Sequence, residues 1–401
     1  MICFYFQVHQ PIRLKRIKMW DRGNLYDHLD SEKNREIFDR VSEKCYFPTT
    51  TLIQELMDEH EGFKVSFSLS GVWIEQCKLF QPELLDLFRD LCKRRNVELL
   101  GETYYHSLSS LYEEQDEFRE QIELHRKALG ELFNASPQIF RNTELIYDNR
   151  LVRTVRDKGF KGILTEGTER VLGWRSPNYL YKPFHLDNIA ILLKNYRLSD
   201  DIAFRFSNWE WNEYPLTADK YVNWLSKESG DCINLFMDYE TFGEHQWRET
   251  GIFEFFRCLP GYALDRGLTF ATPSQLVREL KPVGTIDSPF AISWADMERD
   301  VSAWLDNEMQ QDCFNEIRDL KHHVKEKGDE DLTHFWRLMQ TSDHFYYMST
   351  KWYEGDQDIH SYFNPYRSPY IGFINYVNAM ENLKSKLNQR GLNQSQEVGS
   401  S

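Results

Sequence analysis

The chain has 401 residues, of which 41% are hydrophobic and 28% charged, a balance typical of a globular protein. Its formal net charge of −15 makes binding to a nucleic acid or to an anionic membrane surface unfavourable. No apolar run reaches the roughly 20 residues that span a bilayer, and the first segment lacks the features of a signal peptide. The seven cysteines are scattered without a CxxC pair, which favours a reducing, cytoplasmic compartment.

The first two-thirds of the chain alternates short β-rich runs with helical stretches. The initial run ICFYFQV is apolar throughout, as is typical of a strand that is buried on both faces. Repeated strand–helix–strand units imply a parallel sheet, and seven or eight strands favour a closed barrel over an open sheet. We predict strands over residues 2–8, 63–69, 97–100, 139–141, 162–165, 189–194, 232–237 and 268–271.

A segment with proline and glycine, residues 281–290, separates this part from a C-terminal region without a strand signal. In that region we predict helices over 300–327, 331–348 and 368–386. The expected organisation is therefore a catalytic α/β barrel over 1–280, a helical bundle over 281–386 packed on the barrel rim, and a disordered polar tail over 387–401.

Polar side chains follow four of the predicted strands. His9 and Gln10 follow the first strand, His106 the third, Glu144 the fourth and Asp238 the seventh. Because active sites of parallel α/β proteins lie at the carboxyl ends of the strands, we expect these residues at one rim. A pair of carboxylates can divide the roles of nucleophile and general acid, as in glycoside hydrolysis. The alternative is that Glu144 and Asp238 are the N-caps of the helices that follow.

The remaining motifs bear on binding and on metals. Sugar rings stack on aromatic side chains, and Trp209, Trp247 and Trp294 are among the tryptophans near the strand ends. No two histidines are three to five residues apart, and the two His-x-Asp triplets, at 28–30 and 185–187, match the frequency expected by chance. Nucleotide-binding and serine-hydrolase motifs are absent from the sequence. We therefore expect neither a metal nor a cofactor.

Five short motifs, in this order, resemble the conserved regions of glycoside hydrolase family 57, which contains α-amylases, glucanotransferases and branching enzymes. They are HQP at residues 9–11, TE at 143–144, DxExFGxH at 238–245, the segment 293–305, and QTSD at 340–343. The resemblance implies a (β/α)7 pseudo-TIM barrel followed by an all-α bundle, and a retaining hydrolase that acts on α-1,4-glucans.

The resemblance also implies roles for single residues. It places the nucleophile on Glu144 and the general acid/base on Asp238, and it assigns the binding of the central sugar to His9 and His106. Asp343 of the QTSD motif joins the predicted substrate-binding residues, together with Gln10 and the three tryptophans named above.

Three alternatives remain open from the sequence. Hydrolysis and transfer share their first half-reaction, so a 4-α-glucanotransferase or branching activity would use the same motifs. A metal-dependent polysaccharide deacetylase or α-mannosidase on a similar barrel is a rival enzyme class, for which the His-x-Asp triplets are the candidate ligands. A non-catalytic carbohydrate-binding relative is the third alternative, although both carboxylates are present.

Overall fold

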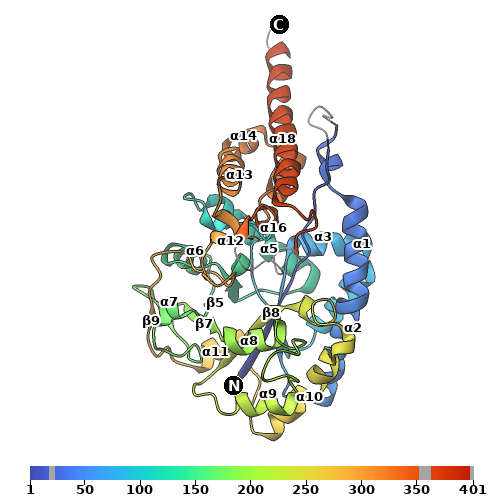
Figure 1. Ribbon diagram of the computed structural model, residues 1–401. Coiled ribbons are helices and arrows are strands. Elements are labelled where there is room, and N and C mark those ends of the chain that lie inside the picture. Colours follow the sequence, from blue (N-terminus) through green and yellow to red (C-terminus); the bar gives the residue numbers. More distant parts are fainter. Residues whose placement is uncertain (18–22, 352–362, 398–401) are drawn as a thin grey trace. The chain divides into compact units, whose positions relative to one another are not determined.

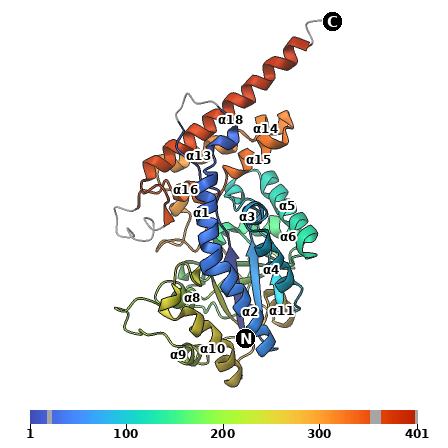
Figure 2. The same ribbon diagram turned by 90° about the vertical axis from the view of Figure 1, so that its right-hand side faces the viewer.

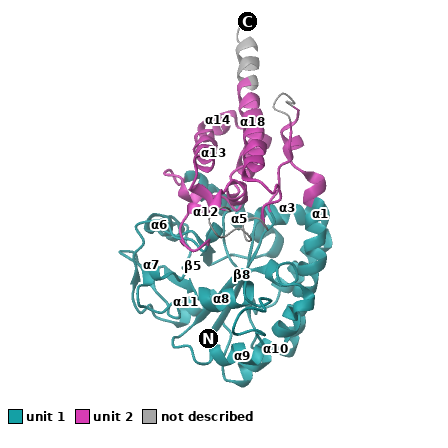
Figure 3. Cartoon of the chain, viewed as in Figure 1, with its two compact units in different colours: residues 1–10, 35–104, 116–294 teal, residues 11–34, 105–115, 295–401 magenta. Residues whose placement is uncertain are grey.

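The computed structural model describes residues 1–17, 23–351 and 363–397 (Figure 1). The chain divides into two compact units that are interleaved along the sequence (Figure 3). The domain ranges predicted from the sequence are contiguous, whereas each observed unit gathers three separate segments. Unit 1 contains residues 1–10, 35–104 and 116–294, and unit 2 contains residues 11–34, 105–115 and the described part of 295–401.

Unit 1 is built on a seven-stranded parallel sheet with the strand order β3-β2-β1-β8-β7-β5-β4. All seven residues of the first strand are buried, as its continuous apolar run predicts. The sheet curls so that its two edge strands meet through Gly101, which forms a parallel bridge with Phe140. The strands are β1 (Ile2–Val8), β2 (Val65–Leu69), β3 (Val97–Leu99), β4 (Ile139–Arg141), β5 (Gly162–Glu166), β7 (Ala190–Lys194) and β8 (Ile233–Asp238).

The eighth strand predicted at residues 268–271 is wrong. Within it only Phe270 pairs with the sheet, as an isolated bridge to Ile2. The capping box of Thr272 starts the next helix, Pro273–Glu279, directly after this bridge, so no ladder of strand hydrogen bonds forms there. The observed barrel therefore has seven strands, which confirms the (β/α)7 expectation. A separate two-stranded sheet pairs β6 (Lys182–Pro183) with β9 (Thr285–Ile286).

Helices cover the strands of unit 1. Figure 2 shows α8, α9 and α10 on one side of the strands and α4, α5 and α6 on the other. His125 lies on the buried face of α5, where its Nδ1 accepts from the Glu102 backbone N–H at 3.1 Å. The helices are α2 (Phe47–Glu59), α3 (Gly71–Phe80), α4 (Pro82–Cys92), α5 (Asp116–Phe133), α6 (Asn149–Asp157), α7 (Glu169–Leu172), α8 (Tyr196–Ala203), α9 (Ala218–Leu225), α10 (Ile252–Asp265) and α11 (Pro273–Glu279); α1 (Ser31–Val41) begins in unit 2 and ends in unit 1.

Unit 2 is helical in its C-terminal segment, but its helices are shorter than predicted. The single helix expected over 300–327 is wrong, because Asn307 caps a new helix through a reciprocal hydrogen-bond pair with Gln310. The helix expected over 331–348 is also divided, between residues 338 and 342. The helices are α12 (Ser302–Leu305), α13 (Glu308–Asp319), α14 (Lys321–Lys327), α15 (Glu330–Leu338), α16 (Ser342–Tyr346) and α18 (Pro369–Glu397).

The last helix extends beyond the predicted boundary at residue 386. α18 continues through 387–397, where we expected a disordered tail, and this stretch contains no proline that would end the helix. Residues 398–401 of the expected tail lie outside the described residues. In the part of the chain that the structure describes, no helix has the length and hydropathy needed to cross a bilayer. All seven cysteines fall in the described ranges and are free thiols.

Candidate functional site

Glu144, the predicted nucleophile, lies in a tight turn directly after β4. Its backbone is left-handed, with φ 56° and ψ 23°, and the next residue, Leu145, has φ 52°. Such values cost a residue that carries a Cβ about 1–2 kcal/mol. The turn is held by Asn142, whose Nδ2 donates to the Ile146 carbonyl at 3.0 Å. Strained backbone of this kind is concentrated at functional sites, and here it coincides with the predicted nucleophile.

The helix-cap alternative fails for both carboxylates. The helix after Glu144 is α6, and its N-cap is Asp148, whose side chain accepts from the Leu151 N–H. Asp238 precedes the 3-10 turn Tyr239–Thr241, but its side chain makes no capping hydrogen bond. Neither carboxylate is therefore used to start a helix.

Trp294 contacts Glu144 directly. Its indole Nε1–H donates to Glu144 Oε2 at 2.6 Å, and its backbone N–H donates to the Glu144 carbonyl at 3.2 Å. The Trp294 ring packs on Phe236, with centroids 5.1 Å apart. Two cations also lie over this ring, Arg141 at 5.8 Å and Lys194 at 5.2 Å from its centroid. The structure thus gives Trp294 a contact with the nucleophile, while its predicted contact with substrate stays a prediction.

Arg141 is the last residue of β4 and is fully buried. Burial lowers the pKa of its guanidinium, and the negative charges of Glu102, Glu144 and Asp238 act in the opposite direction. Its Nη1 lies 3.8 Å from Glu102 Oε2. One buried cation therefore interacts electrostatically with both predicted catalytic carboxylates, which come from the ends of different strands.

Asp238 ends β8 and is followed by a loop whose side chains are anchored in the protein interior. Glu240 accepts a hydrogen bond from the hydroxyl of Tyr46, a residue of the π-helical turn Ser42–Tyr46. Burial and the charge of Asp238 raise the pKa of Glu240 to about 8. The two neighbouring acids of this pair therefore hold a proton at a higher pH than an isolated carboxyl group would.

The two residues that follow β1 are also fixed by hydrogen bonds within unit 1. His9 Nδ1 lies 2.7 Å from Ser70 Oγ. The carbonyl of Gln10 accepts from Gln76 Nε2 at 2.6 Å, and the Gln10 side chain is hydrogen-bonded to Tyr46. The HQP motif is thus tied to the same tyrosine that holds Glu240.

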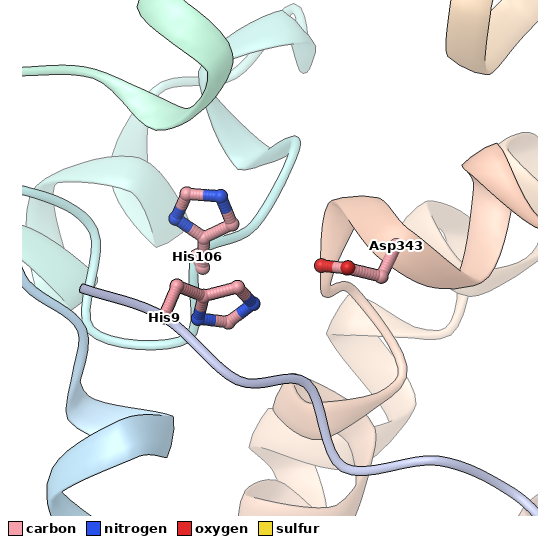
Figure 4. Close-up of side chains that lie close together, drawn as sticks. All are labelled: His9, His106 and Asp343. Atoms are coloured by element: carbon pink, nitrogen blue, oxygen red, sulfur yellow. The ribbon is translucent and has the colours of Figure 1, made fainter. Parts of the chain in front are cut away.

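Two predicted site residues, His106 and Asp343, belong to unit 2 and lie close together there. A ring nitrogen of His106 and a carboxylate oxygen of Asp343 are within 4.8 Å of each other, and Figure 4 labels both side chains together with His9. The His106 carbonyl accepts from the Ser342 N–H at 3.0 Å. Unit 2 therefore joins the loop of His106 to the QTSD motif, although the two segments are far apart in the sequence.

The other two predicted tryptophans lie on the surface of unit 1. The exposed fractions are 76% for Trp209 and 59% for Trp247. Lys44 Nζ lies 5.8 Å from the ring centroid of Trp247. Their exposure suits contact with a ligand, and their roles stay predictions. Sequence reasoning assigned no role to Arg141, although a charged residue in the buried run Ile139–Arg141 was a readable signal.

Comparisons with known proteins show the family to which the chain belongs. Residues 3–289 match the family described as glycosyl hydrolase family 57. A Methanocaldococcus jannaschii protein provisionally named an α-amylase is 48% identical over 392 residues, which are 95% of this chain and 83% of that protein. The α-amylase of Pyrococcus horikoshii is 24% identical over 262 residues, which are 64% of this chain and 39% of that protein.

Solved structures resemble the whole fold. The crystal structure of a GH57-type branching enzyme from Pyrococcus horikoshii has a TM-score of 0.71 at 14% identity, and the match covers 94% of this chain and 88% of that one. The 4-α-glucanotransferase of Thermococcus litoralis has a TM-score of 0.59 at 17% identity, over 94% of this chain and 59% of that one. At such low identity the likeness concerns the fold alone. From its sequence match and its barrel, the chain belongs to glycosyl hydrolase family 57.

Proposed function

We propose that the protein is an α-amylase-type glycoside hydrolase that cleaves α-1,4-glucans with retention of anomeric configuration. Family membership supports a glycoside hydrolase, and the names of the relatives from Methanocaldococcus jannaschii and Pyrococcus horikoshii support an α-glucan as substrate. The observation that carries the proposal is the pair Glu144 and Asp238, which follow or end strands of one barrel and interact with the same buried cation, Arg141.

In this mechanism Glu144 attacks the anomeric carbon while Asp238 protonates the leaving glycosidic oxygen. The product of this step is a glycosyl–enzyme ester on Glu144. Asp238 then takes a proton from water, whose oxygen attacks the anomeric carbon and releases Glu144. Retention requires a separation of about 5–5.5 Å between the two carboxyl groups. The hydrogen bond from Trp294 supports the role of Glu144, because it fixes the orientation of the carboxylate through one of its oxygens.

The remaining predicted residues belong to the same proposal as substrate contacts. His9 and Gln10 follow β1, and His106 and Asp343 lie together in unit 2. The exposed rings of Trp209 and Trp247 suit stacking on outer sugar units. A cytoplasmic, reducing location is also part of the proposal, and the seven free cysteines support it.

Product analysis tests the proposed reaction. The protein is incubated with maltoheptaose, and the products are separated by chromatography while new reducing ends are counted. Hydrolysis yields shorter oligosaccharides with one new reducing end per cleavage. The second candidate, glucan transfer, yields longer chains without a net gain of reducing ends. A 4-α-glucanotransferase of Thermococcus litoralis that is 22% identical over 261 residues favours this candidate.

Three variants test the assignment of the residues. Glu144→Gln should abolish formation of the glycosyl–enzyme, and Asp238→Asn should lower kcat by about 10²- to 10⁴-fold, as expected for loss of a general acid. Asp265→Asn is the matched control, because it removes an exposed carboxylate at the end of α10. Full activity of Glu144→Gln, or equal loss in Asp265→Asn, would contradict the assignment.

A further inference from the structure

A buried guanidinium group lies next to the proposed nucleophile. Arg141 has an exposed fraction of 0%, and within the described residues none of its three guanidinium nitrogens has a hydrogen-bond partner. A charge that is removed from water is costly unless other charges or polar groups stabilise it. The charge of Arg141 at the end of β4 must therefore be stabilised by the groups around it.

The surroundings of Arg141 show which groups compensate its charge. Glu102 Oε2 lies 3.8 Å from its Nη1, and Glu144 and Asp238 add favourable electrostatic interactions. The rings of Phe236 and Trp294 lie 5.2 and 5.8 Å from its Cζ, distances at which a cation is attracted to an aromatic face. The guanidinium is thus enclosed by acids and by rings that hold it without direct hydrogen bonds.

The Trp294 ring connects Arg141 to the nucleophile. The same indole that lies under the guanidinium donates its N–H to Glu144 Oε2 at 2.6 Å. A displacement of the guanidinium would therefore disturb both the electrostatic environment of Glu144 and the ring that fixes its orientation. A carboxylate that acts as a nucleophile must be ionised and correctly oriented. The charge of Arg141 favours the ionised form, and the Trp294 ring beside it fixes the orientation.

We propose that Arg141 is a positioning residue for Glu144, whose buried charge keeps the nucleophile ionised and whose contact with Trp294 keeps it oriented. The inference rests on the proposed role of Glu144 as the nucleophile. Other titratable or charged groups surround this centre: Tyr5 on β1, Glu102 after β3, Glu166 at the end of β5, Lys194 at the end of β7, Asp200 on α8, Asp238 at the end of β8, and Glu240 beside it.

These neighbours do not replace Arg141 as the counter-charge of Glu144. Lys194, the other buried cation in this group, is 3.5 Å from Glu166 and 3.3 Å from Asp200, so its charge is already balanced. Glu102 and Asp238 are acids and would disfavour the ionised form of Glu144 in the absence of Arg141. Removal of the guanidinium should therefore make Glu144 a weaker acid.

The experiment measures the ionisation of Glu144 in a reaction that does not need Asp238 as a general acid. The probe is 5-fluoro-α-maltosyl fluoride. Attack by the carboxylate forms a glycosyl ester and expels fluoride, a leaving group that needs little protonation. The labelling rate is followed against pH, and mass spectrometry locates the label. In the wild type, labelling of Glu144 tests the proposed function by itself, and an unlabelled Glu144 would reject that function independently of Arg141.

The variants are Arg141→Met, which removes the charge, and Arg141→Lys, which keeps it. We expect the midpoint of the pH dependence to rise by about one to three pH units in Arg141→Met, the range seen for a carboxylate beside an arginine. In Arg141→Lys the midpoint should stay near that of the wild type while the maximal rate falls. Arg126→Met is the matched control, because Arg126 also lies over a ring, 4.8 Å from the centroid of Phe160, but on α5 beside Glu123.

An unchanged midpoint in a folded Arg141→Met protein would overturn the inference, whatever happens to the maximal rate. If Arg141→Met does not fold, the double variant Arg141→Gln with Glu102→Gln replaces it. This variant removes both members of the buried pair and leaves no uncompensated charge. Its midpoint is compared with that of Glu102→Gln alone, so that both proteins lack the charge of Glu102. The midpoint should be higher in the double variant, and equal midpoints would overturn the inference.

Discussion

Replacing Gly243 by alanine would place a methyl group inside the loop that follows Asp238. Gly243 has φ +109°, and a Cβ built on its backbone would lie 2.0 Å from the carbonyl oxygen of Lys44 and 3.1 Å from Phe253 Cζ. The obstructing oxygen belongs to the backbone of the π-helical turn Ser42–Tyr46, so no side-chain rotation can relieve the clash. Either the turn or the loop must move.

The size of the effect follows from two contributions. A residue with a Cβ at this φ costs about 1–3 kcal/mol in backbone strain. Overpacking against a fixed atom adds about 1–3 kcal/mol. We therefore expect Gly243→Ala to lower the free energy of unfolding by about 2–6 kcal/mol. Displacement of the turn would also disturb the hydrogen bond between Tyr46 and Glu240, two residues from Asp238.

Urea unfolding, followed by tryptophan fluorescence, measures this change. Gly267→Ala is the matched control, since Gly267 has φ +76° and a Cβ there would meet nothing within 4 Å. The control should show only the strain of about 1–3 kcal/mol, and the difference between the two variants isolates the clash with Lys44. If Gly243→Ala is no less stable than Gly267→Ala, the close approach of the loop to the turn is not as described.

Three further perturbations test other parts of the structure. Trp294→Phe removes the N–H bound to Glu144, a hydrogen bond to a charged group worth about 1.5–3 kcal/mol; the acidic limb of the pH profile of kcat/KM should move to higher pH, and a change in KM alone would instead indicate sugar stacking. Burial raises the pKa of Glu75 from 4.5 to about 7, so between these pH values the folded state binds a proton that the unfolded state has lost, and the free energy of unfolding falls as pH rises. Glu75→Gln should remove this pH dependence in urea titrations at several pH values. An unaltered pH dependence would contradict the raised pKa of Glu75. Asn307→Ala should lower the free energy of unfolding by about 1 kcal/mol through loss of the α13 cap, whereas exposed Asn315→Ala in the same helix should change it by less than about 0.5 kcal/mol.

The strands of unit 1 could be predicted because their signal is local. A continuous apolar run such as Ile2–Val8 has few alternatives to a buried strand, and the polar residues after it mark the strand end. The broken helix near Asn307 could not be predicted from apolar periodicity, which continues across the break. The capping box of Asn307 and Gln310 is also a local signal, but a prediction based on apolar periodicity does not use it.

The strand-end positions of Glu144 and Asp238 could be predicted from the sequence, and their environment could not. Glu144 and Asp238 follow or end strands, so their place at the barrel rim depends only on local order along the chain. The left-handed backbone of Glu144 and the burial of Arg141 depend on tertiary contacts that no short motif records. The same holds for His106, whose loop pairs with residues that come much later in the sequence.

Interleaving of the two units imposes an order on folding during translation. Every segment of unit 1 precedes residue 295, so the barrel can close before the last quarter of the chain is made. Tyr105, in contrast, accepts a hydrogen bond from the hydroxyl of Thr341, a residue 236 positions later. At a synthesis rate of about 5–20 residues per second, its segment waits roughly 10–50 seconds for that partner. Throughout this interval residues 11–17, 23–34 and 105–115 lack the later part of their own unit, and they are accessible to chaperones and proteases.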